Sequence, residues 1–382
     1  MSSLLSVRIL FAGGGTGGHL YPAIAIANRI SELLKNKTKV DIAFVGTKRG
    51  LEYRLKEDLG YPLHLINMRG ISRSLAPINL LVPFVILIGL WQSAVILKRF
   101  RPDLVVGTGG YVSWPVLKMA ALLGILTVLQ EQNSDPGIAT RSGAKKARRI
   151  YLGFEDAKKF ITDYSNSLVT GNPVRAEISR GSRDKAITEF KLNPNKKTIL
   201  VLGGSQGARA INNAVVKSLE SKRWAGDVQL LWQTGKRDYT DVMAKVSKLH
   251  WDGALFPFAN NMQDGYAAAD IVIARAGALT LAELIACRLP SILIPFPYAA
   301  GDHQRKNAES LSSGNAAKVI GENDLASLDI LDEAARLLHS PKHAEMKFAV
   351  TKLAQGRRPA VDVIAEDIIS IIQETKQVGS EN

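Results

Sequence analysis

The feature that most constrains the fold of this chain is a plan that occurs twice: an apolar strand, a glycine-rich turn and then a helix. Residues 7–12 have the sequence VRILFA and lead into the glycine loop 13–18. Residues 198–202 have the sequence TILVL and lead into a second loop, 203–208. Short apolar strands that alternate with helical stretches are typical of parallel sheets. Because 382 residues are too many for one ordinary core, we expect two α/β domains.

The expected elements follow from apolar runs between turn residues. Strands are expected at 7–12, 40–46, 63–66, 104–107, 127–130, 149–152, 167–169, 198–202, 228–233, 254–257, 271–274 and 291–294. Helices are expected at 22–34, 51–59, 79–100, 114–123 and 137–146, and the stretch from about residue 342 reads as two more. The two predicted domains are Rossmann-like and cover residues 1–170 and 198–360, with a linker at 171–197. We expect them to face each other across a cleft. A last helix at 361–382 is expected to pack back on the first domain.

The formal net charge of +14 favours anionic partners: nucleic acid, an anionic membrane or a phosphorylated substrate. Nucleic acid is disfavoured, because basic residues are scattered apart from 145–149 and no nucleic-acid-binding module accompanies them. The single cysteine, Cys287, excludes an internal disulfide framework, and the six histidines lack metal-ligand spacing, so we expect no metal site.

Residues 80–97, LLVPFVILIGLWQSAVIL, form a long apolar stretch that is followed by Lys98 and Arg99. Its length approaches the minimum for a membrane span. Proline, glycine and polar residues interrupt it, however, and a strand follows at once, so a spanning helix would break the α/β unit. A helix lying on a membrane surface and a helix packed into the core both remain open.

The first glycine loop contains the pattern GxGxxG, which lets backbone N–H groups approach an oxygen-rich ligand. A dinucleotide-binding domain also needs an acidic residue at the end of its second strand, and here that strand ends at 44–47 with FVGT. A dehydrogenase is therefore disfavoured. Neither loop ends in GK[ST], which excludes a P-loop NTPase.

His19 follows the first loop at the carboxyl end of a strand, where ligands bind to parallel sheets, and Pro22 fits the first turn of the next helix. A neutral imidazole there can accept a proton from an attacking sugar hydroxyl. A histidine that only braces the loop fits this position equally well.

The second loop offers Ser205 and backbone N–H groups to a phosphate at a helix N-terminus. Glu283 follows a turn of small residues, and one carboxylate can accept hydrogen bonds from both hydroxyls of a ribose. A surface glutamate in a first helical turn is the alternative. Gln304 follows a strand end and so lies on the ligand side of the predicted sheet.

Seven stretches, in this order along the chain, resemble the MurG family of bacterial UDP-N-acetylglucosamine:undecaprenyl-diphosphate-muramoylpentapeptide N-acetylglucosaminyltransferases. They are GGGTGGHLYPAIAIA (13–27), GTGGYVSWP (107–115), EQN (131–133), TGNPVR (170–175), GGSQGA (203–208), RAGALTLAE (275–283) and DHQRKNA (302–308). One departure is Gln130, which stands where the family usually has a histidine before EQN, and we interpret this position as structural.

The resemblance implies a GT-B fold that binds the UDP-sugar in the C-terminal domain and the lipid-linked acceptor on the N-terminal domain. It implies that His19 is the catalytic residue. The implied substrate-binding residues are Thr16, Gly17, Gly18, Asn133, Arg175, Ser205, Gln206, Gly207, Ala259, Ala278, Leu279, Thr280, Glu283 and Gln304. By the same resemblance Ser205 holds the diphosphate, Glu283 the ribose and Gln304 the sugar hydroxyls, and uracil lies near Phe258 and Ala259.

The implied reaction is an inverting transfer of N-acetylglucosamine from UDP-N-acetylglucosamine to the undecaprenyl-diphosphate-linked muramoylpentapeptide, lipid I to lipid II, in peptidoglycan synthesis. No obligatory cofactor or metal is expected, and the enzyme is expected at the cytoplasmic face of the anionic inner membrane as a peripheral protein. The alternatives are a glycosyltransferase acting on another lipid acceptor, a UDP-N-acetylglucosamine 2-epimerase, and a silent sugar-nucleotide-binding scaffold. Acidic acid/base residues in the cleft would favour the epimerase.

Overall fold

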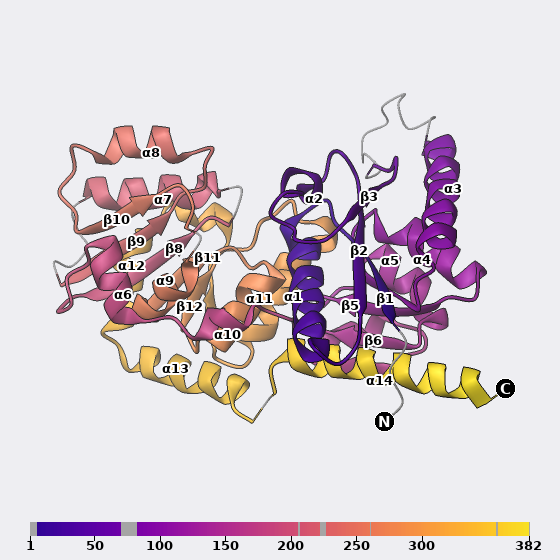
Figure 1. Cartoon of the computed structure of the whole chain (residues 1–382). Coiled ribbons are helices and arrows are strands. Elements are labelled where there is room, and N and C mark those ends of the chain that lie inside the picture. Colours follow the sequence, from indigo (N-terminus) through magenta and orange to yellow (C-terminus); the bar gives the residue numbers. More distant parts are fainter. Residues whose placement is uncertain are drawn as a thin grey trace. The chain divides into compact units, whose positions relative to one another are not determined.

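The computed structural model describes residues 6–69, 82–204, 207–221, 227–259, 261–356 and 358–381 (Figure 1). The chain forms two compact units. The first consists of Met1–Val174 and Arg358–Asn382, and the second of Arg175–Arg357. Each unit has its own parallel sheet covered by helices, which confirms the predicted pair of Rossmann-like α/β domains. That the two sheets face each other across a cleft stays a prediction.

The sheet of the first unit has seven strands in the order β3-β2-β1-β4-β5-β6-β7, and every pair is parallel. The strands are β1 (Val7–Gly13), β2 (Val40–Gly46), β3 (Leu63–Leu65), β4 (Leu104–Gly109), β5 (Leu126–Glu131), β6 (Arg149–Leu152) and β7 (Ser167–Val169). The order reverses between β1 and β4. At such a reversal the carboxyl ends of the strands are the usual place for a ligand.

Helices cover both faces of this sheet: α1 (Gly17–Leu34), α2 (Leu51–Arg54), α3 (Val82–Phe100), α4 (Ser113–Leu122), α5 (Ile138–Gly143) and α14 (Ala360–Glu381). Alternate side chains of β1 enter two different cores, as the period of a strand requires. Ile9 and Phe11 pack in a cluster with α1 and α14, whereas Leu10 and Ala12 pack in a cluster with α4.

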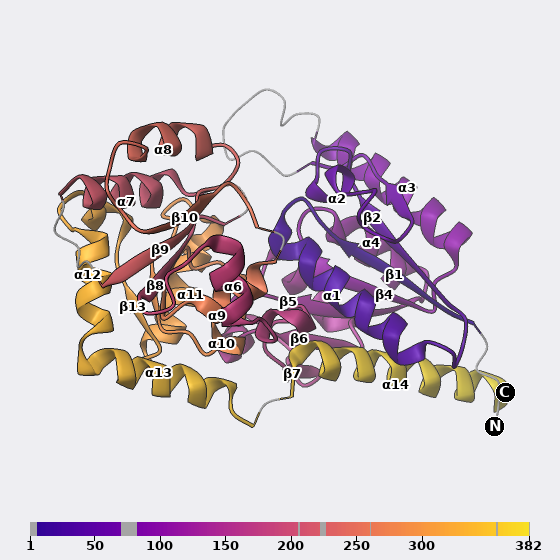
Figure 2. The same cartoon turned by 60° about the vertical axis from the view of Figure 1, so that its left-hand side comes forward.

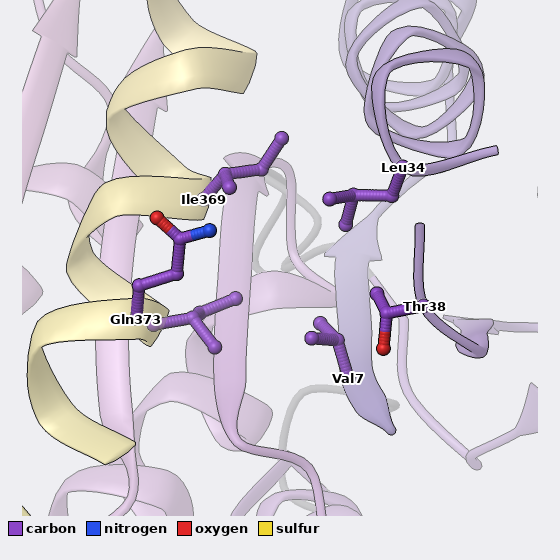
Figure 3. Close-up of a pocket in the computed structure, with 6 residues that line it drawn as sticks. Val7, Leu34, Thr38, Ile369 and Gln373 are labelled. Carbon is purple, nitrogen blue, oxygen red and sulfur yellow. The ribbon is translucent and has the colours of Figure 1, made fainter. Parts of the chain in front are cut away.

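The C-terminal helix α14 packs on α1 and across the sheet of the first unit (Figure 2). Ile364 and Ile368 belong to the same buried cluster as Ile26 of α1. Asp367 accepts hydrogen bonds from Arg149 Nε at 2.9 Å and from the Tyr151 hydroxyl at 2.8 Å, so α14 is joined to β6. Figure 3 shows the small apolar gap that remains between α14, β1 and the end of α1, lined by Val7, Leu34, Thr38, Ile369, Ile372 and Gln373.

The second unit repeats the plan with the parallel strand order β10-β9-β8-β11-β12-β13. Its strands are β8 (Lys197–Leu202), β9 (Val228–Gln233), β10 (Gly253–Phe256), β11 (Ile271–Ala274), β12 (Ser291–Leu293) and β13 (Ala317–Val319). Its helices are α6 (Arg183–Phe190), α7 (Arg209–Ser221), α8 (Tyr239–Val246), α9 (Met262–Ala268), α10 (Ala278–Ala286), α11 (His303–Ser312), α12 (Ile330–Leu338) and α13 (Pro341–Ala354). Here the strand order reverses between β8 and β11.

The expected strands agree with the observed ones to within one or two residues, apart from the short edge strand β13, which sequence reasoning missed. Three expectations need correction. The helix expected at 51–59 ends already at Arg54. Helix α1 begins at Gly17, so Pro22 lies inside the helix and His19 lies in its first turn rather than before it. The stretch predicted as linker contains α6, which packs on α9, so residues 175–197 belong to the second unit.

Candidate functional site

In the first unit, the loops after β1, β2, β4 and β5 lie at the carboxyl ends of adjacent strands. The predicted residues Thr16, Gly17, Gly18 and His19 lie at the start of α1, directly after the turn that follows β1. Thr16 is the N-cap of α1, and Thr16 and Gly18 are exposed while His19 is half-buried. This is the edge at which parallel sheets bind ligands.

The imidazole of His19 is anchored through one nitrogen. Its Nδ1 lies 3.1 Å from the carbonyl oxygen of Thr108 and 2.9 Å from Oε1 of Gln132. The hydroxyl of Thr108 in turn donates to the carbonyl oxygen of His19 at 2.8 Å. Since a carbonyl oxygen only accepts, Nδ1 is the donor in both contacts, and Nε2 of the neutral ring carries the lone pair. Such a ring can act as a general base through Nε2.

A buried carboxylate supports the glycine loop of the first unit. Glu52 is fully buried and accepts hydrogen bonds from the backbone N–H of Gly15 at 2.8 Å and of Thr47 at 2.9 Å. Gly15 has a φ of +86°, and Cβ atoms added at Gly14 or Gly50 would lie within 3 Å of the Glu52 carboxylate. The loop therefore needs glycine because the carboxylate approaches its backbone closely.

Asn133 lies in the loop after β5, in the first unit. Its backbone N–H and its Nδ2 donate to Oε1 of Glu131, at 3.0 and 3.3 Å. The other oxygen of Glu131 accepts from the Gly137 N–H and from the Thr140 hydroxyl. The buried Glu131 thus holds the loop that presents Asn133 at the same edge of the sheet as His19.

In the second unit, the predicted donor residues follow β8 and β11, on either side of the point at which the strand order reverses. Ser205 and Gln206 lie outside the described residues. Gly207 has a φ of +81°, and a Cβ there would lie 2.6 Å from the carbonyl oxygen of Thr234, so the loop passes close to the end of β9. Ala278, Leu279 and Thr280 form the first turn of α10, at the positive end of the helix dipole. Such an N-terminus attracts phosphate.

Glu283 lies one turn further along α10, where the Tyr266 hydroxyl donates a 2.7 Å hydrogen bond to its Oε2. Burial raises the pKa of Glu283, and both the Tyr266 hydrogen bond and the charge of Arg175 oppose that rise. Burial and the nearby Glu283 also raise the pKa of Tyr266 well above its ordinary value, so the phenol remains a donor. The carboxylate is therefore anchored through one oxygen.

Two further predicted residues follow β10 and β12: Ala259 lies in the loop after β10, and Gln304 lies in the first turn of α11. The Ala259 N–H donates to Gln233 Oε1 at 3.1 Å, so a contact between Ala259 and a base would use its carbonyl oxygen. Gln304 Oε1 accepts from the Phe296 N–H at 3.0 Å. Arg275 stacks over the Phe296 ring at 5.3 Å and donates to the carbonyl oxygen of Pro295, which fixes this loop.

Sequence reasoning did not single out Glu52, Thr108, Gln132 or Tyr266. Thr108 and Gln132 lie inside two of the family motifs, at 107–115 and 131–133. Their position in these motifs was the one sequence feature that could have identified them as site residues. Glu52 lies in a predicted helix, and Tyr266 lies in a stretch for which no element was predicted. Their roles depend on partners at Gly15 and Glu283, which only the fold brings near.

Helix α3 contains most of the long apolar stretch that was singled out in the sequence. Gly89, Ser93 and Leu97 form its buried face. Large apolar side chains on other faces remain exposed: Phe84 64%, Leu87 63%, Ile88 46% and Trp91 68%. Among the described residues α3 is the one helix long and apolar enough to cross a membrane, and 17% of its most apolar window is buried. It carries an uncovered apolar stripe with Lys98 and Arg99 at its end.

Two family models match this chain. The glycosyltransferase family 28 N-terminal domain matches residues 9–152, and the glycosyltransferase family 28 C-terminal domain matches residues 198–361. Among curated proteins, the UDP-N-acetylglucosamine–N-acetylmuramyl-(pentapeptide) pyrophosphoryl-undecaprenol N-acetylglucosamine transferase of Chlorobium luteolum is 41% identical over 96% of this chain and 100% of its own length. The transferase of the same name from Chlorobaculum tepidum is 42% identical over 96% and 99%.

Solved structures give the same fold. The crystal structure of Acinetobacter baumannii MurG has a TM-score of 0.72 and 26% identity, and the match covers 96% of this chain and 99% of that one. The UDP-GlcNAc 2-epimerase of Neisseria meningitidis has a TM-score of 0.61 at 13% identity, covering 97% and 100%. At that identity the likeness to the epimerase reflects the shared fold alone.

Proposed function

This chain belongs to glycosyltransferase family 28, and within it to the MurG N-acetylglucosaminyltransferases, and from this premise we propose its reaction. It transfers N-acetylglucosamine from UDP-N-acetylglucosamine to the 4-hydroxyl of the muramoyl sugar in undecaprenyl-diphosphate-muramoylpentapeptide. The observation that carries this proposal is that relatives named for this transfer are 41–42% identical to the chain over nearly the whole length of both proteins.

His19 is the general base in this proposal. As the 4-hydroxyl oxygen forms a bond to the anomeric carbon, the bond between that carbon and the UDP oxygen breaks, and the configuration inverts. The hydroxyl proton passes to Nε2 of His19, which the anchoring of Nδ1 leaves as the acceptor atom. UDP leaves with the electron pair of the broken bond.

The donor binds to the second unit. The loop with Ser205, Gln206 and Gly207 and the α10 N-terminus with Ala278, Leu279 and Thr280 hold the diphosphate through backbone N–H groups and the helix dipole. Glu283 accepts hydrogen bonds from the ribose hydroxyls. Gln304, whose oxygen is already engaged with Phe296, donates through its amide nitrogen to the transferred sugar. Arg175 stabilises the charge that develops on UDP.

A membrane surface supplies the lipid-linked acceptor. The exposed stripe of Phe84, Leu87, Ile88 and Trp91 on α3 matches the interfacial layer of a bilayer, and the adjoining Lys98 and Arg99 match anionic head groups. The enzyme is therefore a peripheral protein of the cytoplasmic face of the inner membrane, held by α3.

The first experiment measures transfer of labelled N-acetylglucosamine to a purified polyprenyl-diphosphate-muramoyl-peptide. Wild type, His19→Ala and Glu283→Ala are compared, with the exposed His250→Ala and Glu220→Ala as matched controls. Activity that collapses with the first two changes and persists in the controls supports the proposal. Donor binding without transfer to this acceptor contradicts it, and 2-epimerisation of the donor would point to the isomerase.

Membrane attachment is tested by sedimentation with phosphatidylglycerol vesicles. The double change Phe84→Ser and Trp91→Ser removes two apolar side chains from α3 and is expected to lower the bound fraction at least tenfold, since each buried aromatic contributes about 1.5–3 kcal/mol. Phe348→Ser removes an equally exposed phenylalanine, 72% exposed, from the second unit and is expected to change nothing. Equal binding of both variants would contradict a role for α3.

A further inference from the structure

The amide of Gln132 can take only one orientation beside His19. Its Nε2 donates to the carbonyl oxygen of Thr108 at 2.7 Å and also faces the backbone and side-chain oxygens of Gln130. Rotating the amide by half a turn would place its oxygen against these acceptors. The network therefore directs Gln132 Oε1 toward His19 Nδ1, at 2.9 Å.

A third amide closes the network behind Gln132. Gln130 Nε2 donates to Asn172 Oδ1 at 3.1 Å, and Asn172 Nδ2 donates to the Gln132 carbonyl oxygen at 2.9 Å. The three residues are 0%, 2% and 7% exposed. An amide that is buried and bonded at both ends is costly to reorient, because each displaced bond leaves an unsatisfied polar group. None of these three side chains titrates, so the network keeps its hydrogen-bond directions over the pH range in which histidine changes charge.

The backbone of β4 restricts the imidazole itself. A Cβ added at Gly109 would lie 2.7 Å from His19 Nδ1, and one at Gly110 would lie 3.2 Å from Cδ2. Both glycines have positive φ, +98° and +80°. The strand end thus passes directly against the ring, which leaves little room for the ring to turn its other nitrogen toward Thr108 and Gln132.

We propose that Gln132, supported by Gln130 and Asn172, is a positioning residue that keeps the neutral His19 ring protonated at Nδ1 and unprotonated at Nε2. The amide network sets which nitrogen is the base and which way it points. This inference rests on the proposed function, in which His19 accepts the proton of the acceptor hydroxyl.

The test reads the tautomer directly, from ring ¹⁵N chemical shifts of histidine-labelled protein at a pH at least two units above the ordinary histidine pKa of about 6.5. The His19 signals are assigned by their loss in His19→Gln. Wild type is expected to show Nδ1 protonated and Nε2 unprotonated. Gln132→Met is expected to give a mixture of tautomers and to lower kcat about 10- to 100-fold, with unchanged binding of UDP-N-acetylglucosamine.

Gln229→Met is the matched control. Gln229 is a buried glutamine of the second unit that also bonds at both ends of its amide, to Asn193 and Thr198, so its loss costs similar stability. It is expected to leave the His19 shifts and kcat unchanged. If Gln132→Met does not fold, Gln132→Asn keeps the amide but withdraws it from Nδ1 by one methylene, and it is expected to give the same mixture.

A wild-type ring protonated at Nε2, or a Gln132 variant with unchanged tautomer and kcat, would overturn the inference. The tautomer is measured without substrate, so it is independent of the reaction. A wild-type tautomer as expected, with full transfer activity in His19→Gln, would refute the proposed base while leaving the role of Gln132 in fixing the tautomer intact.

Discussion

The hydroxyl of Tyr266 lies 2.7 Å from Oε2 of Glu283, although Tyr266 is on α9 and Glu283 on α10. Burial raises the pKa of this carboxyl, and the Tyr266 hydrogen bond and the charge of Arg175 lower it. The same contact leaves Oε1 of Glu283 as the oxygen available to a ribose. Tyr266 therefore both orients the carboxylate and favours its charged form.

Tyr266→Phe is expected to weaken the binding of UDP-N-acetylglucosamine about 2- to 10-fold near neutral pH, the usual range for one hydrogen bond. Because the lost bond lowers the pKa of Glu283, that pKa rises further in the variant. The loss of donor affinity on acidification should then begin at higher pH. Isothermal titration of the donor at several pH values measures this, with Tyr239→Phe as the control. If donor affinity began to fall at the same pH in wild type and in Tyr266→Phe, the prediction would be contradicted.

Glu283→Gln is expected to bind the donor at least tenfold more weakly and yet to be more stable at pH 7. Burial holds the pKa of Glu283 above its ordinary value of 4.5, so the folded chain binds this proton more tightly than the unfolded chain does. The folded chain therefore loses stability as the pH rises from the pKa of Glu283 in the unfolded chain to its pKa in the folded chain. The cost of ionising the buried carboxyl persists at neutral pH. Thermal unfolding should show a Tm above wild type at pH 7 and none of this gain below about pH 4. A gain in Tm of equal size at both pH values would show that the gain does not come from ionisation of Glu283.

Glu52→Gln is expected to be nearly as destabilising as Glu52→Ala, by about 1–3 kcal/mol. Both carboxylate oxygens accept from backbone N–H groups, of Gly15 and Thr47, and an amide would turn a donor toward one of them. Urea unfolding measures the loss, and the exposed Glu57→Gln should change stability by less than about 0.5 kcal/mol. A glutamine that restores wild-type stability would show that one acceptor suffices.

Ile368→Ala is expected to lower the unfolding free energy by about 2–4 kcal/mol, because this α14 side chain is fully buried in the core of the first unit. Glu374→Ala on the exposed side of the same helix is the control, since an exposed ion pair contributes little. The measurement is urea unfolding of the full chain. A loss no larger than the control's would mean that α14 does not stabilise this unit.

Transfer is expected to continue in excess EDTA. The α10 N-terminus and Arg175 supply positive potential for the diphosphate, so no metal is required in the proposed mechanism. The transfer assay with and without chelator measures this. Loss of activity that Mg²⁺ restores would contradict the expectation.

Local patterns in the sequence were enough to identify the two Rossmann-like units. Apolar runs such as 40–46 and 271–274 alternate with helical stretches. Such elements can be predicted because the spacing of apolar residues along the chain is a local property. The short β13 was missed because its three residues, AKV, include a lysine and form no apolar run. The start of α1 was misplaced because Pro22 suggested the first turn of the helix. The helix begins earlier, at Gly17, with Thr16 as its N-cap.

The sequence by itself determined the fold class, the order of strands and glycine loops, and the family motifs that contain His19 and Glu283. Tertiary structure alone decided what those residues contact. His19 meets Thr108 and Gln132, which are 89 and 113 residues away, because β1, β4 and β5 end at the same edge of one sheet. Hydrogen-bond partners that far apart leave no periodic trace in the chain, so the proton position on His19 follows only from the packed strands.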